Sequence, residues 1–166
     1  FIVERYRALY LSAGFRNDEI SAVIQSGATR PLDFDRRLKA VSKFRRTPTA
    51  VNLAAANKRI RNILRKVDQQ VPLKINEQLF EHPSEHDLSA VLVHISTEVS
   101  PLIERADYAG ALKQLSALSI PIDRFFDDVM VMAEDPMLRS NRLALLNQLA
   151  TLFLAIADIS VLRMSD

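Results

Sequence analysis

Apolar residues recur along this chain at spacings of three and four rather than two, which is the period of an amphipathic helix. Only three glycines occur among the 166 residues, so few positions favour a break in a helix. We therefore expect helices nearly throughout and predict an all-α fold class. Because the expected connections are short, neighbouring helices should run antiparallel and form a bundle.

Glycine, proline and short polar residues mark the expected ends of these helices. Gly14 and Gly27 suit the left-handed conformation that ends a helix. Residues 68–83 should form a connection with one short turn around Leu79 and Phe80, and Pro101 should kink or end the helix that contains it. Helix caps are expected at Asn17, Asp33, Thr47 and Asp135, with Pro48 and Pro136 in the first turn after Thr47 and Asp135, and further helices should open at Ser84, Asp107 and Pro121.

Two consecutive expected helices combine an apolar stripe with a cationic exterior. In the first, Phe34, Leu38, Val41 and Phe44 form the stripe. In the second, at 100° per residue, the apolar side chains fall within about 60° of one direction and the cations lie opposite. The apolar set is Leu53, Ala56, Ile60, Ile63, Leu64 and Val67, and the cationic set is Lys58, Arg59, Arg61, Arg65 and Lys66.

The length of the chain suits one helical domain, residues 1–166, which can bury a core without disulfides or metal. Within it, residues 1–30 should be entry helices continuing from an absent upstream domain, and residues 31–166 the bundle. The first residue, Phe1, suggests a fragment of a longer protein. No secretory signal opens the chain, and Asn147, Gln148 and Asp158 favour a buried helix over a membrane span for residues 143–162.

Several patterns that could carry chemistry have simpler interpretations. The chain has no cysteine, which excludes thiolate metal sites and a cysteine nucleophile. His82 and His86, with Glu81 and Glu85 nearby, have the spacing of a metal pair, but Pro83 should interrupt the helix that such a pair requires. No metal site is expected.

The acidic residues after position 120 also suggest a site at first. Asp123, Asp127 and Asp128 could form a catalytic carboxylate set, but helix capping and ion pairs with Arg139 or Arg142 explain them better. The chain has no glycine-rich phosphate loop and no Gly-x-Ser-x-Gly motif. We expect no independent active site and no cofactor in this chain.

Charge is distributed very unevenly along the chain. Residues 30–66 hold twelve of the 22 Lys and Arg residues and only two acids, a net charge of +10, whereas residues 67–136 carry a net charge of −9. Such a concentration of positive charge indicates a polyanionic partner. Nucleic acid is the first candidate, an acidic protein surface the second and an acidic membrane the third. Because the two aromatic side chains of the basic stretch, Phe34 and Phe44, should face inward, a folded nucleic acid is favoured over a long single strand.

Four segments of the chain follow the pattern of a known family: residues 56–66 (ANKRIRNILRK), 118–133 (LSIPIDRFFDDVMVMA), 139–146 (RSNRLALL) and 157–160 (ADIS). Together with Asp135, they resemble the C-terminal region of the bacterial-type glycyl-tRNA synthetase beta subunit. The resemblance implies an all-helical, DALR-like anticodon-binding domain without a catalytic site, at the end of a subunit that partners a catalytic alpha subunit. It further implies glycine-specific tRNA as ligand, ATP and magnesium handled elsewhere in the enzyme, and a cytoplasmic location.

The candidate tRNA contacts follow from charge and helical geometry. Lys58, Arg61 and Arg65 cluster on one part of the cationic face, and Arg59 and Lys66 lie on its flank. Second candidates are Arg36, Arg37, Lys43 and Arg45. The alternative function is a helical assembly module whose basic face meets an acidic surface of a partner protein.

Overall fold

The computed structural model describes residues 1–164, and every element within them is helical. The all-α fold class is therefore confirmed. In chain order the α-helices of the described residues are α1 (Ile2–Ser12), α2 (Asn17–Gln25), α3 (Pro31–Phe44), α4 (Ala50–Arg65), α5 (Pro83–Glu104), α6 (Tyr108–Leu115), α7 (Ser119–Asp128) and α8 (Pro136–Leu154). Short 3-10 turns are η1 (Glu77–Leu79), η2 (Ser116–Leu118) and η3 (Ile159–Val161).

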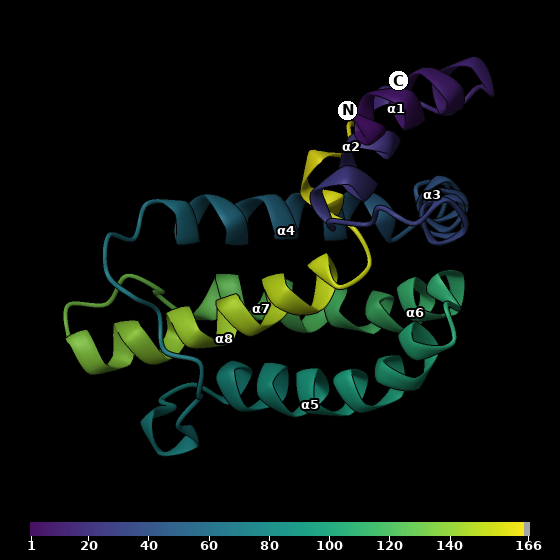
Figure 1. Cartoon of the computed structure of the whole chain (residues 1–166). Coiled ribbons are helices and arrows are strands. Elements are labelled where there is room, and N and C mark those ends of the chain that lie inside the picture. The colour runs from purple at the N-terminus through teal and green to yellow at the C-terminus, as the bar shows by residue number, and fades with distance from the viewer. Residues whose placement is uncertain (165–166) are drawn as a thin grey trace.

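The long helices stack in layers (Figure 1). α7 and α8 form a middle layer that packs against α4 on one side and α5 on the other. α6 packs on α5 and α3 at one end of the stack, and α1 and α2 extend the molecule beyond α3. Consequently the outer side of α4 is covered along much of its length by no other helix of the described residues (Figure 1).

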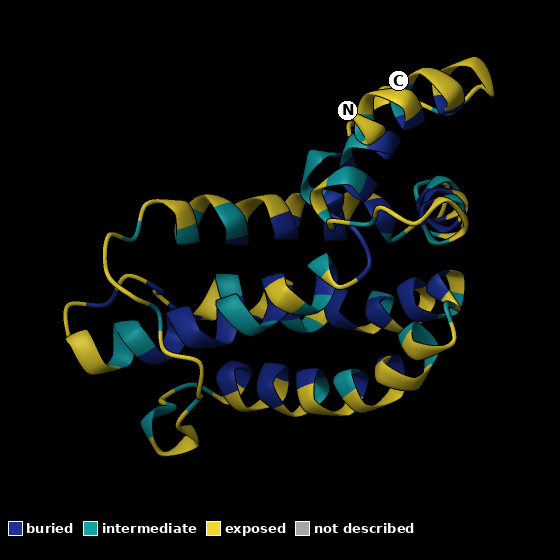
Figure 2. Ribbon diagram, in the orientation of Figure 1, coloured by how far each residue is buried: buried dark blue, intermediate teal, exposed yellow. Residues whose placement is uncertain are grey.

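Buried apolar side chains fill the spaces between these layers. Burial in Figure 2 follows the inward faces of the long helices, with exposed residues along their outer sides. α4 shows the expected stripe: Leu53 and Ile60 are fully buried, and Ile63 and Leu64 pack partly buried against the core. Burial of such aliphatic side chains contributes about 1.5–3 kcal/mol each, so the stripe fixes which side of α4 faces solvent.

The C-terminal end of the described residues packs against the helix α2 near the N-terminus. The backbone N–H of Asp158 donates to the carbonyl of Ala22 over 2.9 Å, and the N–H of Arg163 donates to the Asp18 carboxylate over 2.7 Å. The 3-10 turn η3 packs on both α2 and α4. The two ends of the chain are therefore held together near the start of the bundle (Figure 1).

A buried ion pair joins α5 to α8. Arg142, of which 4% is exposed, donates to Glu85 over 2.9 Å and to the Met130 carbonyl over 2.9 Å. Burial alone raises the pKa of Glu85, but hydrogen bonds from Arg142 and from the N–H groups of His82 and Glu81 outweigh it and lower that pKa below its ordinary value. The charged pair thus fixes the register of the two helices.

Several predicted helix ends are confirmed. Gly14 and Gly27 adopt φ values of +95° and +80° directly after α1 and α2. The Asp107 carboxylate caps α6 by accepting from the N–H of Gly110, and the Asp135 carboxylate caps α8 by accepting from the N–H of Met137. The short turn in the long connection is η1. Pro101, in contrast, does not end its helix, because α5 continues through it to Glu104.

Other predicted starts were wrong by one or two residues. α2 begins at Asn17 itself, so Arg16 is its N-cap, and Pro121 lies inside the first turn of α7 rather than opening it. α5 begins at Pro83 with His82 as N-cap, whereas Ser84 was expected to open it. Proline at the first helical position needs no N–H donor, so Pro83 displaces the start toward the N-terminus.

The starts of the two basic helices also differ from the prediction. Asp33 is not the cap of α3, because Pro31 opens that helix and Arg30 precedes it. Thr47 does not cap α4: its hydroxyl donates to the carbonyl of Phe44 over 2.7 Å, and α4 begins at Ala50. Thr47 therefore completes the end of α3 and leaves a longer turn before α4.

No helix within residues 1–164 combines the length and the hydropathy that a bilayer span requires. The apolar segment 143–162, expected to be a buried helix, lies mostly in α8, which supplies seven buried apolar residues to the core.

Candidate nucleic-acid interface

The outer side of α4 is an uncommitted cationic surface. We call Lys58, Arg59, Arg65 and Lys66 the α4 cationic face; all four side chains are exposed. Within residues 1–164 none of the four takes part in an ion pair shorter than 4.0 Å. Their charge is therefore available to a ligand, at a helix whose opposite side is fixed by the core.

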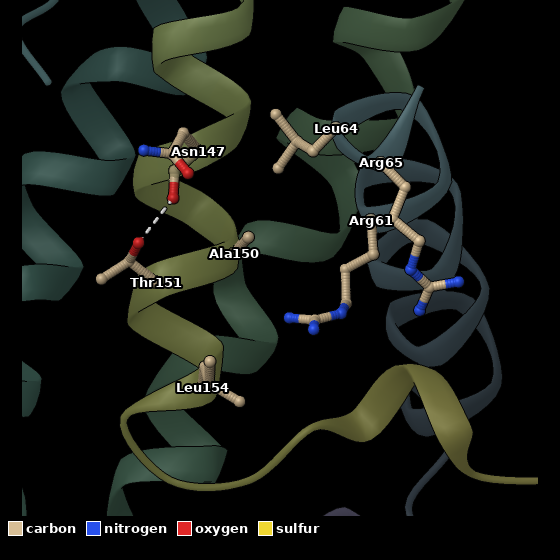
Figure 3. A pocket seen from close by; sticks show the side chains of 7 residues that line it. All are labelled: Arg61, Leu64, Arg65, Asn147, Ala150, Thr151 and Leu154. Atoms are coloured by element: carbon tan, nitrogen blue, oxygen red, sulfur yellow. Dashed lines mark hydrogen bonds between the residues drawn. The ribbon is translucent and has the colours of Figure 1, made fainter. Parts of the chain in front are cut away.

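A groove runs along one side of this face, between α4 and α8 (Figure 3). It has a volume of about 270 Å³. Arg61 extends from α4 into the space between the two helices (Figure 3), and its Nε lies 3.4 Å from the buried Asp158 carboxylate. Arg61 is thus partly engaged by the fold, with 24% of its side chain exposed. The groove is lined by Arg61, Leu64, Arg65, Asn147, Ala150, Thr151 and Leu154.

A second groove lies on the other side of α4, against α7, with a volume of about 380 Å³. The Arg59 guanidinium lies over the Phe126 ring, 4.1 Å from its centroid, and Asp123 and Asp127 line the same groove with Asn52. α4 is therefore a ridge with a cation-bearing groove on each side.

Arg37, predicted as a second candidate contact, is held inside the fold. Its Nε donates to Asp33 over 2.8 Å, and one terminal nitrogen donates to the carbonyls of Ala155 and Ile156 over 2.9 and 2.8 Å. The guanidinium also lies 4.4 Å from the centroid of the Tyr108 ring. Arg37 thus caps the C-terminal end of α8 and joins it to α3.

Arg45 is engaged in the same way. It pairs with Asp18 over 2.8 Å and with Glu19 over 3.5 Å, and it donates to the carbonyl of Arg163. Burial raises the pKa of Asp18, but hydrogen bonds from the Arg163 N–H and from Arg45 outweigh it and hold that pKa below its ordinary value. Arg45 therefore fastens α2 and the C-terminal tail to the end of α3.

The remaining second candidates, Arg36 and Lys43, are exposed on α3. Lys43 borders a groove of about 670 Å³ between α3 and α6, which Lys113 also lines. The structure thus divides the predicted contacts into an exposed set and an engaged set. The exposed set is Arg36, Lys43, Lys58, Arg59, Arg65 and Lys66, and the engaged set is Arg37, Arg45 and Arg61.

The other candidate chemistry has structural roles. His82 is the N-cap of α5, and the ring of His86 meets Phe80 edge-on at 4.9 Å. Residues 1–164 contain no group of three or more His, Cys, Asp or Glu able to hold a metal ion. The predicted pairing of Asp127 or Asp128 with Arg139 or Arg142 was wrong. Arg142 pairs with Glu85 and Glu81, while Arg139 donates to the carbonyl of Ala133.

The groove against α7 contains residues that were not assigned to the site from sequence. The sequence pattern indicated Asp123 and Asp127 only as part of a carboxylate set, and it gave Phe126 no role beyond its place in the segment 118–133. Their one signal was spacing, since Asp123, Phe126 and Asp127 lie three and four apart on one side of a helix. Nothing in the sequence indicated that this side meets Arg59.

A layered helical bundle with an unpaired cationic ridge is typical of a nucleic-acid-binding domain. The family described as the DALR anticodon binding domain matches residues 53–162, and the chain belongs to this family. The match begins within α4 and ends just after η3.

The chain is also similar to glycine–tRNA ligase beta subunits. It is 46% identical over 162 residues to that of Psychromonas ingrahamii, and over 163 residues it is 48% identical to that of Aeromonas salmonicida and 50% identical to that of Haemophilus influenzae. Each alignment covers 98% of this chain but 24% of the relative. The resemblance noted in four segments is therefore confirmed across nearly the whole chain.

Proposed function

We propose that this chain binds the anticodon arm of a glycine-specific tRNA and thereby supports glycylation carried out elsewhere in a larger enzyme. The observation that carries the proposal is the α4 cationic face, whose exposed side chains have no ion-pair partner within the described residues. Membership of the anticodon-binding family supports tRNA as the polyanion.

In this proposal the ridge and its grooves have different tasks. Lys58, Arg65 and Lys66 contact phosphates of the anticodon arm, which positions the RNA without selecting its sequence. A helix with its side chains is about 10–12 Å across, so a strand crossing α4 can place bases in both grooves. Because bases in an RNA loop are unstacked more readily than in a duplex, they can enter such grooves.

The similarity to glycine–tRNA ligase beta subunits suggests which other molecules this chain works with. The chain spans 24% of the length of those beta subunits. We propose that an alpha subunit of the same enzyme carries the reaction and that the setting is the cytoplasm. We further propose that ATP and Mg²⁺ are handled elsewhere in that enzyme, as the similarity to glycine–tRNA ligase beta subunits implies.

Salt dependence of tRNA binding tests the proposal. Lys58→Ala, Arg65→Ala and Lys66→Ala, combined in the full-length protein, should flatten the slope of log K against log salt by about 0.7–0.9 per lost phosphate contact. A matched control removes three exposed cations outside α4, through Arg5→Ala, Lys74→Ala and Arg105→Ala. Filter binding with glycine-specific tRNA over a salt series measures both.

The two variants separate the proposal from its rival. A flatter slope for the α4 variant alone supports a tRNA contact on α4. An unchanged slope, together with weaker association with the alpha subunit in size-exclusion chromatography, would instead favour an assembly module that meets an acidic protein surface.

A further inference from the structure

The groove between α4 and α7 contains a planar platform made of a guanidinium and an aromatic ring. The Arg59 guanidinium lies 4.1 Å from the centroid of the Phe126 ring. Phe126 in turn meets Phe125 edge-on, at 5.6 Å between centroids, and Phe125 is fully buried. The core holds the aromatic pair in place, and the cation–π contact with the ring favours this position of the guanidinium before any ligand arrives.

This platform suits the face of a nucleobase. Arg59 is exposed, so the side of its guanidinium away from Phe126 is open to a ligand. Unpaired RNA bases stack on guanidinium planes as well as on aromatic rings. The groove of about 380 Å³ lies within the range of small-ligand sites. A single unstacked base therefore fits the shape and the chemistry of this place.

Two carboxylates border the platform. Asp123 and Asp127 lie four residues apart on α7, on either side of Phe126 in the sequence, and both are exposed. Within the described residues neither forms an ion pair shorter than 4.0 Å, with Arg59 or with any other cation. Their oxygens are therefore free to accept hydrogen bonds from a ligand.

These carboxylates determine which part of an RNA can enter. An ionised carboxylate only accepts hydrogen bonds and repels phosphate, so a phosphate belongs on the ridge and not in this groove. The amino group of cytosine, adenine or guanine donates to a carboxylate. Uracil has no amino group and presents mainly carbonyl acceptors. Asn52, which both donates and accepts, can contact the rest of the base edge.

We propose, resting on the proposed tRNA binding, that the groove between α4 and α7 binds one unstacked base. The base stacks on Arg59 above Phe126, and its amino group donates to Asp123 or Asp127. This pocket selects bases that carry an amino group over uracil, and so contributes sequence specificity that the α4 phosphate contacts cannot supply.

The test uses the full-length protein and a set of hairpin RNAs that share one stem and loop and differ only in a single loop base. Each loop position is varied in turn among cytosine, adenine, guanine and uracil. We expect one position at which uracil weakens binding about 10-fold, the discrimination of one good base-edge contact. Removing both carboxylates, through Asp123→Ala and Asp127→Ala, takes away the acceptors for the amino group and should abolish this preference.

Two further variants separate the platform from the charge. Arg59→Lys keeps the positive charge but has no planar face to stack on, so it should weaken binding of the preferred hairpin and leave the salt slope unchanged. Asp128→Ala removes a neighbouring exposed carboxylate that does not line the groove and should preserve the preference. All of these side chains are exposed, so helix content by circular dichroism should stay unchanged.

Three results would overturn the inference: equal binding of all four bases at every loop position, a preference that survives in the double Asp→Ala variant, or an equal loss of preference in the Asp128→Ala control. If hairpins and tRNA bind with the expected salt slope while one of these results is found, tRNA binding stands and only the base pocket fails. If no RNA binds, both fail.

Discussion

The helices α3 and α4 look alike in sequence but use their arginines differently. Each combines an apolar stripe with several cations, and both lie in the stretch with a net charge of +10. In α3, Arg37 reaches the carbonyls at the end of α8, and at its end Arg45 reaches Asp18. On α4, Lys58 and Arg65 face solvent without an ion-pair partner among residues 1–164. The surroundings of a helix thus decide whether its charge stabilises the fold or meets a ligand.

The difference has a geometric cause. α3 packs against α2 and α6 and lies near the end of α8, so acidic side chains and uncapped carbonyls surround it. α4 packs against α7 and α8 on its inner side and also contacts η3. Along much of its length, no helix of residues 1–164 covers its outer side (Figure 1). An arginine near a helix C-terminus is drawn to the unpaired carbonyls there.

Among substitutions that test the difference between α3 and α4, the one at Arg45 should have the largest effect on stability. Arg45→Ala leaves Asp18 and the buried Glu19 without their cation, and only 11% of the Arg45 side chain is exposed. Breaking such a pair should lower the free energy of unfolding by about 3 kcal/mol. Urea denaturation measures the loss. Arg46→Ala is the matched control, because Arg46 is exposed and should cost less than about 0.5 kcal/mol. Equal losses in the two variants would contradict an engaged role for Arg45.

Acid should reduce the contribution of Arg45. The pKa of Asp18 is lowered in the folded protein, so its stabilising effect is complete above the ordinary value of 3.8 and is lost as the pH falls through the folded value. The destabilisation caused by Arg45→Ala should therefore shrink below about pH 3.8. Unfolding curves of the two proteins from neutral to acid pH measure this, and a constant difference would rule out the Asp18 pair as its source.

The smallest effect is expected from the exposed cations of α3. Arg36→Ala with Lys43→Ala should leave stability within about 0.5 kcal/mol, because both side chains are exposed. We expect the double variant to weaken tRNA binding by no more than about 3-fold, less than removal of the α4 cationic face does, since these cations lie away from the ridge. Filter binding of the two variants at one salt concentration compares them. A larger loss at α3 would shift the proposed interface to that helix.

Helix existence was predictable because it depends on local patterns. Asp107 and Asp135 cap the helices that the sequence predicted after them. A carboxylate directly before a helical segment accepts hydrogen bonds from the free N–H groups of the first turn, which is a purely local interaction. Thr47 was misassigned because its hydroxyl can serve the helix before it or the helix after it, and it serves the helix before it. The starts near Asp33 and Ser84 failed for a similar reason, as Pro31 and Pro83 open those helices.

The candidate site was predictable only in part. Helical periodicity placed Lys58 and Arg65 opposite the apolar stripe of α4, and both are exposed. It gave the same outward position to Arg61, whose partner Asp158 lies almost one hundred residues away and is brought to α4 by η3. Pairing of Arg142 with Glu85 instead of Asp128 likewise depends on how α5 meets α8.

The sequence by itself determined the helices, the side of α4 that faces the core and the strong concentration of positive charge, because these depend on neighbours within a few turns. Only the tertiary structure decided which arginines are engaged and which are free, and that Arg59 meets Phe126 and two carboxylates of α7. Ion pairs and grooves form between segments distant in sequence, so their partners are fixed by the packing of the layers and not by the local pattern.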